Sequence, residues 1–122
     1  MLNLYEADTT DVATTDNSSY FRALEFKYTE LARTALKKVW LRNDGVTEAT
    51  GHLYVNSIEA GVGQDTWFRF AEDLGGTAGA WERQHAFTLE PGEQVPVWIK
   101  LTVPLTSTPQ QRIDLRVKAT YS

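Results

Sequence analysis

The sequence predicts an all-β protein that folds as an antiparallel sandwich of two sheets. Three observations support this fold class. Apolar and polar residues alternate over several segments, turn-forming Asn, Asp, Gly and Pro residues separate these segments at short intervals, and little of the chain has a convincing helical pattern. The segments amount to about seven or eight strands, with an extended N-terminal segment ahead of them.

The clearest alternation lies near the carboxyl end of the chain, over residues 95–103 and 113–121. In the first of these segments the aliphatic residues share one parity: Val95, Val97, Ile99, Leu101 and Val103. A period of two indicates a strand with one buried face and one exposed face. We therefore expect these aliphatic side chains in the core and Trp98, on the opposite parity, on the outer face.

At the amino end, Leu2 and Leu4 indicate a short first strand, and many Thr, Asp, Asn and Ser residues follow over residues 9–19. A segment of this composition has little to bury, which predicts a loop or an arm on the surface. We therefore divide the chain into an N-terminal strand and polar arm, residues 1–19, and a sandwich domain, residues 20–122.

Residues 20–42 fit two patterns. A helix would place four apolar residues on one face: Leu24, Tyr28, Leu31 and Ala35. We favour two strands, at residues 21–28 and 36–43, because the second segment is β-branched and aromatic and runs into an Asn-Asp-Gly turn. The helix stays open as the alternative.

The middle of the chain predicts three further strands, at residues 52–58, 66–71 and 83–89. Loops containing glycine separate them, at residues 61–63 and 75–79. In the second of these strands the aromatic pair Phe68 and Phe70 faces one side, and Trp67 and Arg69 face the other. A tight turn at Pro91 and Gly92 then leads into the long strand near the carboxyl end, since proline fixes φ and glycine accepts a positive φ.

Composition excludes several classes of protein. A chain of 122 residues is long enough for one hydrophobic core, and its net charge of -4 argues against sequence-independent binding to nucleic acid. Without cysteine it can form neither a disulfide framework nor a thiolate metal site. We find neither a secretory signal nor an apolar run that would span a bilayer, so we expect synthesis in the cytosol and no membrane partner.

Three stretches carry a resemblance to a known group of proteins: Lys38-Val-Trp-Leu-Arg-Asn-Asp-Gly45, a strand ending near Val55-Asn56, and Phe87-Thr-Leu-Glu-Pro-Gly-Glu-Gln-Val-Pro-Val-Trp-Ile-Lys-Leu-Thr-Val-Pro104. Over about residues 20–121 the chain resembles small immunoglobulin-like proteins, which are common in the structural gene clusters of tailed bacteriophages and in some bacterial surface modules.

This resemblance implies an immunoglobulin-like sandwich. In such a fold the Leu-x-Pro-Gly-Glu turn forms an edge-to-core hairpin, and the Arg-Asn-Asp-Gly turn links two strands of the facing sheet. No catalytic residue comes with these motifs. The cysteine pair that flanks a core tryptophan in antibody domains is missing, which argues against close kinship with those domains.

Few residues suggest chemistry. His52 and His85 lie on predicted strands without a neighbouring ligand pair, and no Gly-x-Ser-x-Gly nucleophile motif occurs. His85 shares its parity with apolar residues, which predicts a partly buried, hydrogen-bonded histidine. Four acidic residues cluster around the middle loops and leave an enzyme or a calcium site as weaker hypotheses: Glu59, Asp65, Glu72 and Asp73. We expect no catalytic residue, no metal and no cofactor.

Tryptophans on the outer parity are the most informative side chains for function. Trp40 and Trp98 face away from the core, accompanied by Arg42 and Lys100, and Trp67 follows the same pattern. Large aromatic side chains on an outer face need a cover, which residues 1–19, another protein subunit or a stacked sugar would supply. We take these five residues as a candidate interface.

The outward tryptophans favour a protein that works by binding, and the resemblance implies a non-enzymatic structural or assembly protein of a tailed-phage virion. The first hypothesis is a capsid decoration or cement protein that docks through a face or an edge of the sandwich. The alternatives are a tail or baseplate component, and a module that binds carbohydrate or a host surface. The expected partners are phage capsid or tail proteins and further copies of the chain, and the expected location is the virion.

Overall fold

The structure is a computed structural model that describes residues 2–6, 11–14, 24–29, 31–58, 67–104 and 112–121. Within these ranges the protein consists of antiparallel β-strands in two sheets and has no α-helix, so the predicted all-β class is confirmed. None of the described segments forms a helix that could cross a membrane.

The described residues form nine strands: β1 (Leu2–Glu6), β2 (Asp11–Thr14), β3 (Leu24–Lys27), β4 (Thr34–Asn43), β5 (Ala49–Ile58), β6 (Phe68–Glu72), β7 (His85–Leu89), β8 (Gln94–Thr102) and β9 (Arg112–Tyr121). Strand β1 is the short first strand that the sequence predicts, and β3 to β9 lie within a few residues of the other predicted strands. The predicted loop at residues 61–63 lies outside the described residues, as do residues 21–23.

Two predictions about the first third of the chain are corrected. The helical alternative for residues 20–42 is wrong, because Leu31, which a helical face would bury, is 99% exposed in the turn between β3 and β4. The polar segment at residues 9–19, expected to be a loop or an arm, contains strand β2, which pairs with β1. Backbone pairing with a neighbouring strand stabilises β2 although its short sequence lacks an alternating pattern.

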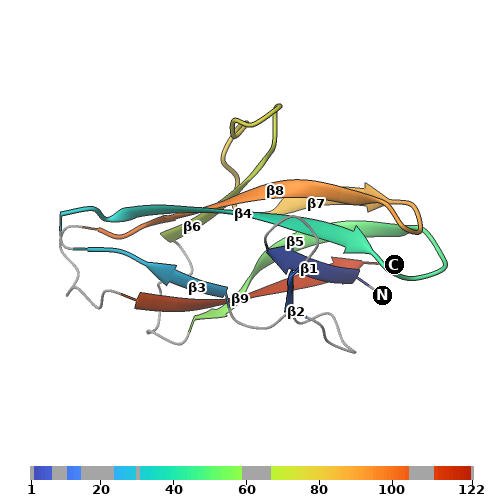
Figure 1. Ribbon diagram of the computed structural model, residues 1–122, viewed down its shortest axis with the longest axis horizontal. Coiled ribbons are helices and arrows are strands. Elements are labelled where there is room, and N and C mark those ends of the chain that lie inside the picture. Colours follow the sequence, from blue (N-terminus) through green and yellow to red (C-terminus); the bar gives the residue numbers. More distant parts are fainter. Residues whose placement is uncertain are drawn as a thin grey trace.

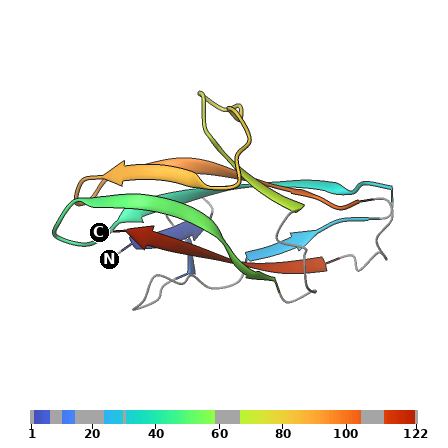
Figure 2. The same ribbon diagram turned by 180° about the vertical axis from the view of Figure 1, so that it is seen from behind.

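The strands form two layers, as Figures 1 and 2 show. One sheet has five strands in the order β2-β1-β4-β8-β6, and the other has four strands in the order β3-β9-β5-β7. From β3 onward, every strand lies in the sheet opposite to that of the strand before it. Among the described strands, β1 and β2 are therefore the only chain neighbours that also pair with each other.

Alternation places the core between the layers, as the sequence predicts. Val97, Ile99 and Leu101 of β8 are completely buried, and so are Val39 and Leu41 of the neighbouring β4. The facing sheet and β6 complete the core with aromatic and aliphatic side chains: Phe26, Leu53, Phe68, Phe70, Leu89 and Val117. Burial of this many large apolar side chains is the main favourable term in folding.

Both turns named from the sequence connect the two sheets. The hairpin expected at Pro91 and Gly92 is therefore wrong, and so is the expectation that the Arg-Asn-Asp-Gly turn links two strands of one sheet. Gly92 has the positive φ that the turn requires, 81°. The backbone of this turn, however, pairs with the end of β4: the Asn43 N–H donates to the Glu93 carbonyl at 3.0 Å, and the Gly92 N–H donates to the Asn43 carbonyl at 2.7 Å. This pairing draws β8 into the sheet of β4, away from β7.

The side chain of Asn43 holds the two turns together. It is 1% exposed, and its amide donates to the Thr47 carbonyl at 2.8 Å and to the Leu89 carbonyl at 3.0 Å. Its carbonyl oxygen accepts a bond from the Gly45 N–H at 2.9 Å. A buried amide that satisfies two backbone groups of the turn after β4 and one at the end of β7 fixes the geometry of this end of the sandwich. The Asn-Asp-Gly signal therefore marks a turn that crosses between the sheets.

Candidate interaction surface

The outer face of the five-stranded sheet carries four of the five residues predicted as an interface. We define the outer face as the side chains of β4 and β8 that point away from the core: Leu36, Lys38, Trp40, Arg42, Pro96, Trp98 and Lys100. Register sets their neighbours, with Lys38 opposite Trp98, Trp40 opposite Pro96 and Leu36 opposite Lys100. The predicted outward parity of Trp98 is confirmed, because its neighbours Val97 and Ile99 are completely buried and Trp98 is partly exposed.

Lys38 lies at the centre of the outer face. Its Nζ lies 5.5 Å from the ring centroid of Trp40 and 5.5 Å from that of Trp98, within the range of cation–π attraction. The same Nζ lies 3.4 Å from a carboxylate oxygen of Asp73, and the indole N–H of Trp98 donates to the other oxygen at 3.0 Å. The two tryptophans, the lysine and the aspartate therefore form one connected group.

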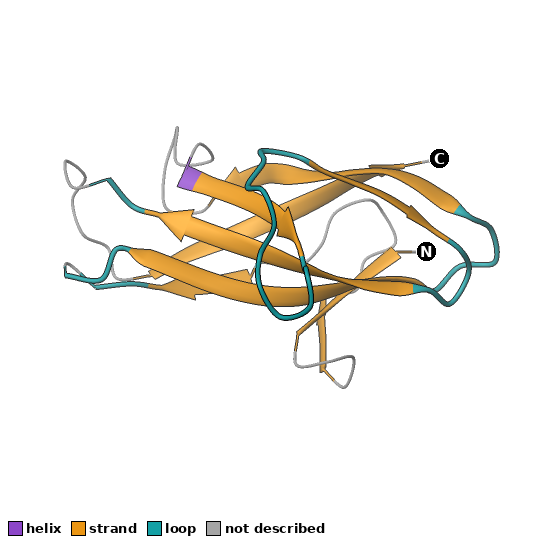
Figure 3. Ribbon diagram, turned by 90° about the horizontal axis from the view of Figure 1, so that it is seen from above, coloured by secondary structure: helices purple, strands orange, loops and turns teal. Residues whose placement is uncertain are grey.

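Asp73 comes from the β6–β7 loop, residues 73–84, which stands off the five-stranded sheet in Figure 1 and crosses over its strands in Figure 3. The hydrogen bond from Trp98 lowers the pKa of Asp73, against the effect of partial desolvation, and the Gly76 N–H and Lys38 act in the same direction as Trp98. Backbone bonds close the loop, with the Leu74 N–H donating to Thr77 and the Gly79 N–H to Glu72. The connector at residues 75–79 thus has a defined turn geometry.

The loop places a further aromatic residue on this surface, Trp81, which sequence reasoning missed. The Lys100 Nζ lies 4.5 Å from the centroid of the Trp81 ring. Glu82, the next residue, exchanges two backbone hydrogen bonds of 2.7 Å with Phe70 of β6. The Trp81 ring therefore extends across β6 toward Lys100.

A second carboxylate group orders the end of the outer face next to β1. Asp44 accepts hydrogen bonds from Asn3 Nδ2 at 2.6 Å, from the Tyr5 hydroxyl at 2.7 Å and from Arg42 Nε at 2.5 Å. The Arg42 guanidinium lies 5.1 Å from the Tyr5 ring centroid. Partial burial raises the pKa of Asp44, but these three donors outweigh it and lower the pKa overall. Arg42, predicted as an interface residue, thus ties β1 to β4.

Trp67 does not join the other four predicted residues on the outer face. It precedes β6 and packs against the buried core cluster. Two segments of the chain itself, β1 and the β6–β7 loop, flank the outer face. Residues 1–19 were predicted as one possible cover of the outer tryptophans, whereas the β6–β7 loop was not. Leu36 is 57% exposed, and the other six residues of the outer face are partly exposed.

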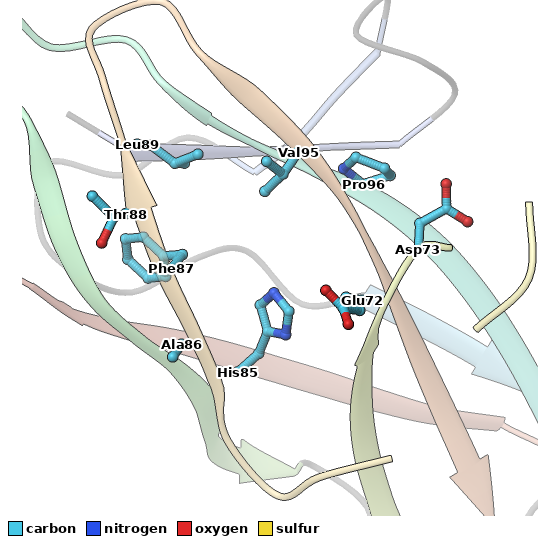
Figure 4. A pocket seen from close by; sticks show the side chains of 9 residues that line it. All are labelled: Glu72, Asp73, His85, Ala86, Phe87, Thr88, Leu89, Val95 and Pro96. Atoms are coloured by element: carbon cyan, nitrogen blue, oxygen red, sulfur yellow. The ribbon is translucent and has the colours of Figure 1, made fainter. Parts of the chain in front are cut away.

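The described residues also enclose a cavity between β7 and the open end of β8, with a volume of about 300 Å³. Its walls are the five residues of β7 together with Glu72, Asp73, Val95 and Pro96. Figure 4 shows the ring of His85 and the carboxylate of Glu72 in the space between β7 and β8. The opening exists because β6 ends at Glu72, which pairs with Val97, so that no described strand pairs with β8 on this side before Val97.

His85 is half-buried, as predicted, and no described side chain hydrogen-bonds to its ring. Burial lowers its pKa, although the negative charges of Glu72 and Glu82 oppose this effect. His52 pairs with Ala86 and is exposed, whereas His85 pairs with the buried Leu53, so the two histidines lie on opposite faces of their sheet. Among the described residues, no three His, Cys, Asp or Glu side chains are placed to hold a metal ion.

Of the four acidic residues considered for chemistry, Glu72 and Asp73 line the cavity, and Glu59 and Asp65 lie outside the described residues. Comparison with known proteins found no matching family model, no matching curated protein and no matching solved structure.

Proposed function

We propose that this protein is a non-enzymatic structural or assembly protein that docks onto a larger protein assembly through the outer face of its five-stranded sheet. The assembly we propose is a tailed-phage virion, with a capsid decoration or cement role first and a tail or baseplate role second. Phage capsid or tail proteins would be the partners, and the virion the location. The virion assignment rests on the resemblance seen in the sequence.

One observation supports docking above the others. Trp40, Trp98, Lys38 and the exposed Leu36 lie together on adjacent strands at the centre of a sheet. Interfaces favour tryptophan and arginine in their energetically important centre, surrounded by residues that exclude water. The bonds of Asp73 hold Lys38 and Trp98 in place before any partner arrives, which reduces the entropy lost on binding.

The immunoglobulin-like assignment stays a proposal at the level of architecture. Two antiparallel sheets packed face to face support it. The order of the strands differs, because immunoglobulin domains form hairpins within each sheet, whereas here the chain changes sheet at every connection after β2. We therefore base the proposed function on the side chains of the outer face rather than on the fold.

Carbohydrate binding, the alternative from another class, has less support from the geometry. A sugar stacks on an open aromatic face and needs polar groups that are free to bond with it. Lys38 lies against the rings of both Trp40 and Trp98, and the indole N–H of Trp98 already donates to Asp73.

The test is retention on purified particles. We would supply tagged protein to phage particles that lack it and quantify the bound protein per particle by mass spectrometry. The substitution Leu36→Glu puts a charge on the outer face, and Val46→Glu puts the same charge at another exposed apolar position, 92% exposed in the turn after β4.

Both positions tolerate a charged side chain, so both variants should fold. We expect fixed stoichiometry for the unchanged protein and for Val46→Glu, and a loss of about tenfold or more in affinity for Leu36→Glu. Absence of the protein from particles would contradict the virion assignment. Equal retention of the two variants would contradict docking through the outer face.

A further inference from the structure

Strand β7 (His85–Leu89) has a free edge. It is the last strand of its sheet and pairs only with β5, so the row of backbone N–H and C=O groups on its other side has no strand to pair with among the described residues. Such an edge is a template for another extended chain. Proteins that do not use an edge for binding block it with proline, charged side chains or a covering segment.

The β7 edge is accessible from both of its sides. The cavity of about 300 Å³ follows all five residues of β7 on the core side. A neighbouring cavity of about 220 Å³ continues past His85 to Ala80 and Glu82. On the opposite side of the sheet a third hollow, of about 330 Å³, lies along Thr50, Gly51 and His52 beside β7.

The strand that faces β7 across the cavity is protected against pairing with a further strand, whereas β7 is not. Pro96 lies on the part of β8 that β6 does not reach, and proline has no N–H to offer to a new strand. Strand β7 contains no proline, lysine or arginine, and its inward side chains Phe87 and Leu89 form an apolar floor with Val95. These features suit an extended peptide with apolar side chains at alternate positions.

The charge around the cavities favours a basic partner. Glu72 and Glu82 line them, and no lysine or arginine does. Asp73 also lines the larger cavity, but its carboxylate bonds to Lys38 and Trp98 on the outer face. Arg83 belongs to a separate hollow with Tyr54 and Val55.

The N-terminal segment of a second copy of this chain suits the edge poorly. It carries Glu6, Asp8, Asp11 and Asp16 and no basic side chain before Arg22. The carboxylates around the cavity would repel such a segment.

We propose that the free edge of β7 binds an extended, basic segment of another protein as an added antiparallel or parallel strand, with apolar side chains entering the cavity between β7 and β8. The edge of β7 belongs to the four-stranded sheet and the outer face to the five-stranded sheet, so the inference goes beyond the proposed function. It holds whether or not the protein belongs to a virion.

The first experiment measures the dissociation constants of two synthetic heptapeptides that alternate valine with lysine or valine with glutamate, by calorimetry on the full chain. We expect the lysine peptide to bind about tenfold more tightly than the glutamate peptide. Two further lysine peptides carry N-methyl groups, one on the valines and one on the lysines. In an added strand, the backbone N–H groups of every second residue donate to the edge, and an N-methyl group removes such a donor. One of these two peptides should therefore lose binding, and the other should keep it.

Charge reversal locates the site. Glu72→Lys should abolish the preference for the lysine peptide, a change of about tenfold, because it replaces attraction by repulsion at the cavity. Glu25→Lys is the matched control, since Glu25 lies on β3 at the opposite edge of the same sheet. Leu36→Glu, on the outer face, should leave peptide binding unchanged, which separates this inference from the proposed function.

Three outcomes would overturn the inference. In one, the lysine peptide shows no binding, or both N-methylated peptides bind as well as the unmodified one. In another, Glu25→Lys and Glu72→Lys change the affinity equally. In the third, sedimentation reveals self-association that the lysine peptide competes away, which would assign the edge to a second copy of this chain.

Discussion

The outer face of the five-stranded sheet and the free edge of β7 differ in where their polar groups find partners. On the outer face, Asp44 and Asp73 each bond to several groups from other segments, and Lys38 has both a carboxylate and two aromatic rings as neighbours. At the edge, β7 has no partner strand on one side among the described residues. The outer face is thus ordered by the protein itself, and the edge retains bonding capacity for a partner.

This difference predicts which measurement responds to a substitution. Groups that bond to one another within the folded chain should affect its stability even in the absence of a partner. Groups that line an open edge should affect binding and leave stability almost unchanged. The outer face can serve as a docking surface as well, because an ordered surface loses little entropy when it binds.

Asp44→Ala should have the largest effect on stability. The substitution removes the carboxylate that accepts from the amide of Asn3 and the hydroxyl of Tyr5, two residues that are 7% and 6% exposed. We expect the free energy of unfolding to fall by about 2 kcal/mol in urea denaturation. Asp44→Asn keeps an acceptor oxygen and should cost less. Equal losses for the two variants would show that charge, rather than hydrogen bonding, is the important property.

Trp98→Phe should have a smaller effect, because it keeps an aromatic ring beside Lys38 and removes, from a partly exposed side chain, the pyrrole part of the indole with the N–H that donates to Asp73. We expect a loss of about 1 kcal/mol in the free energy of unfolding. The pKa of Asp73 should rise toward its ordinary value, since the bond from Trp98 is the main cause of its lowering. NMR titration of the carboxyl carbon measures this, and an unchanged pKa would exclude the bond in solution.

His85 should give a modest dependence of stability on pH at the β7 edge. Because burial lowers its pKa from the ordinary 6.5, the unfolded chain takes up a proton at a higher pH than the folded protein. The contribution of His85 to stability is therefore present above its pKa in the unfolded chain, and it is lost as the pH falls below 6.5 toward its lower pKa in the folded protein. Urea denaturation from about pH 7.5 to about pH 5 should show this loss, and His85→Gln should remove it.

The carboxylates of the outer face respond in a lower pH range. The pKa of Asp44 is lowered from 3.8, so its contribution to stability is lost only as the pH falls below that value. A protein whose stability stayed constant down to about pH 5 in both the original and the His85→Gln chain would contradict the assignment to His85.

Glu72→Lys should have the smallest effect on stability, within about 0.5 kcal/mol, although it is expected to change peptide binding strongly. Glu72 is exposed, and its backbone bond to Gly79 does not involve the side chain. Thermal unfolding measures this directly. A large loss would mean that the carboxylate stabilises the fold, and the contrast between edge and face would then fail.

The positions of most strands, and which of their side chains point into the core, could be predicted from the sequence because alternation with a period of two is a local property. The clearest case is the contrast between the buried side chains of Val97 and Ile99 and the partly exposed side chain of Trp98. The pairing of strands could not be predicted, since the turns after Asn43 and at Gly92 have the residues of a hairpin turn but cross between sheets. The bond of Asn43 to Leu89 helps to decide this, and it joins residues that are 46 positions apart in the sequence.

The candidate surface was predicted only in part for the same reason. Trp40, Arg42, Trp98 and Lys100 lie on regular strands, so parity alone places them on the outer face. Trp81 lies in a loop without a period, and only the pairing of Glu82 with Phe70 brings it to Lys100. Strand β2 also escaped detection, because its four residues depend on β1 for their conformation.

The alternation of strands between the two sheets has a consequence for how the chain acquires its structure. Since consecutive strands after β2 never pair, neither layer can assemble from a contiguous stretch of sequence. Loop closure must precede nearly all of the favourable contacts, so we expect refolding on the millisecond-to-second scale that is typical of all-β topologies. We also expect that no fragment ending before β8 folds by itself, because β8 links β4 to β6 at the centre of its sheet.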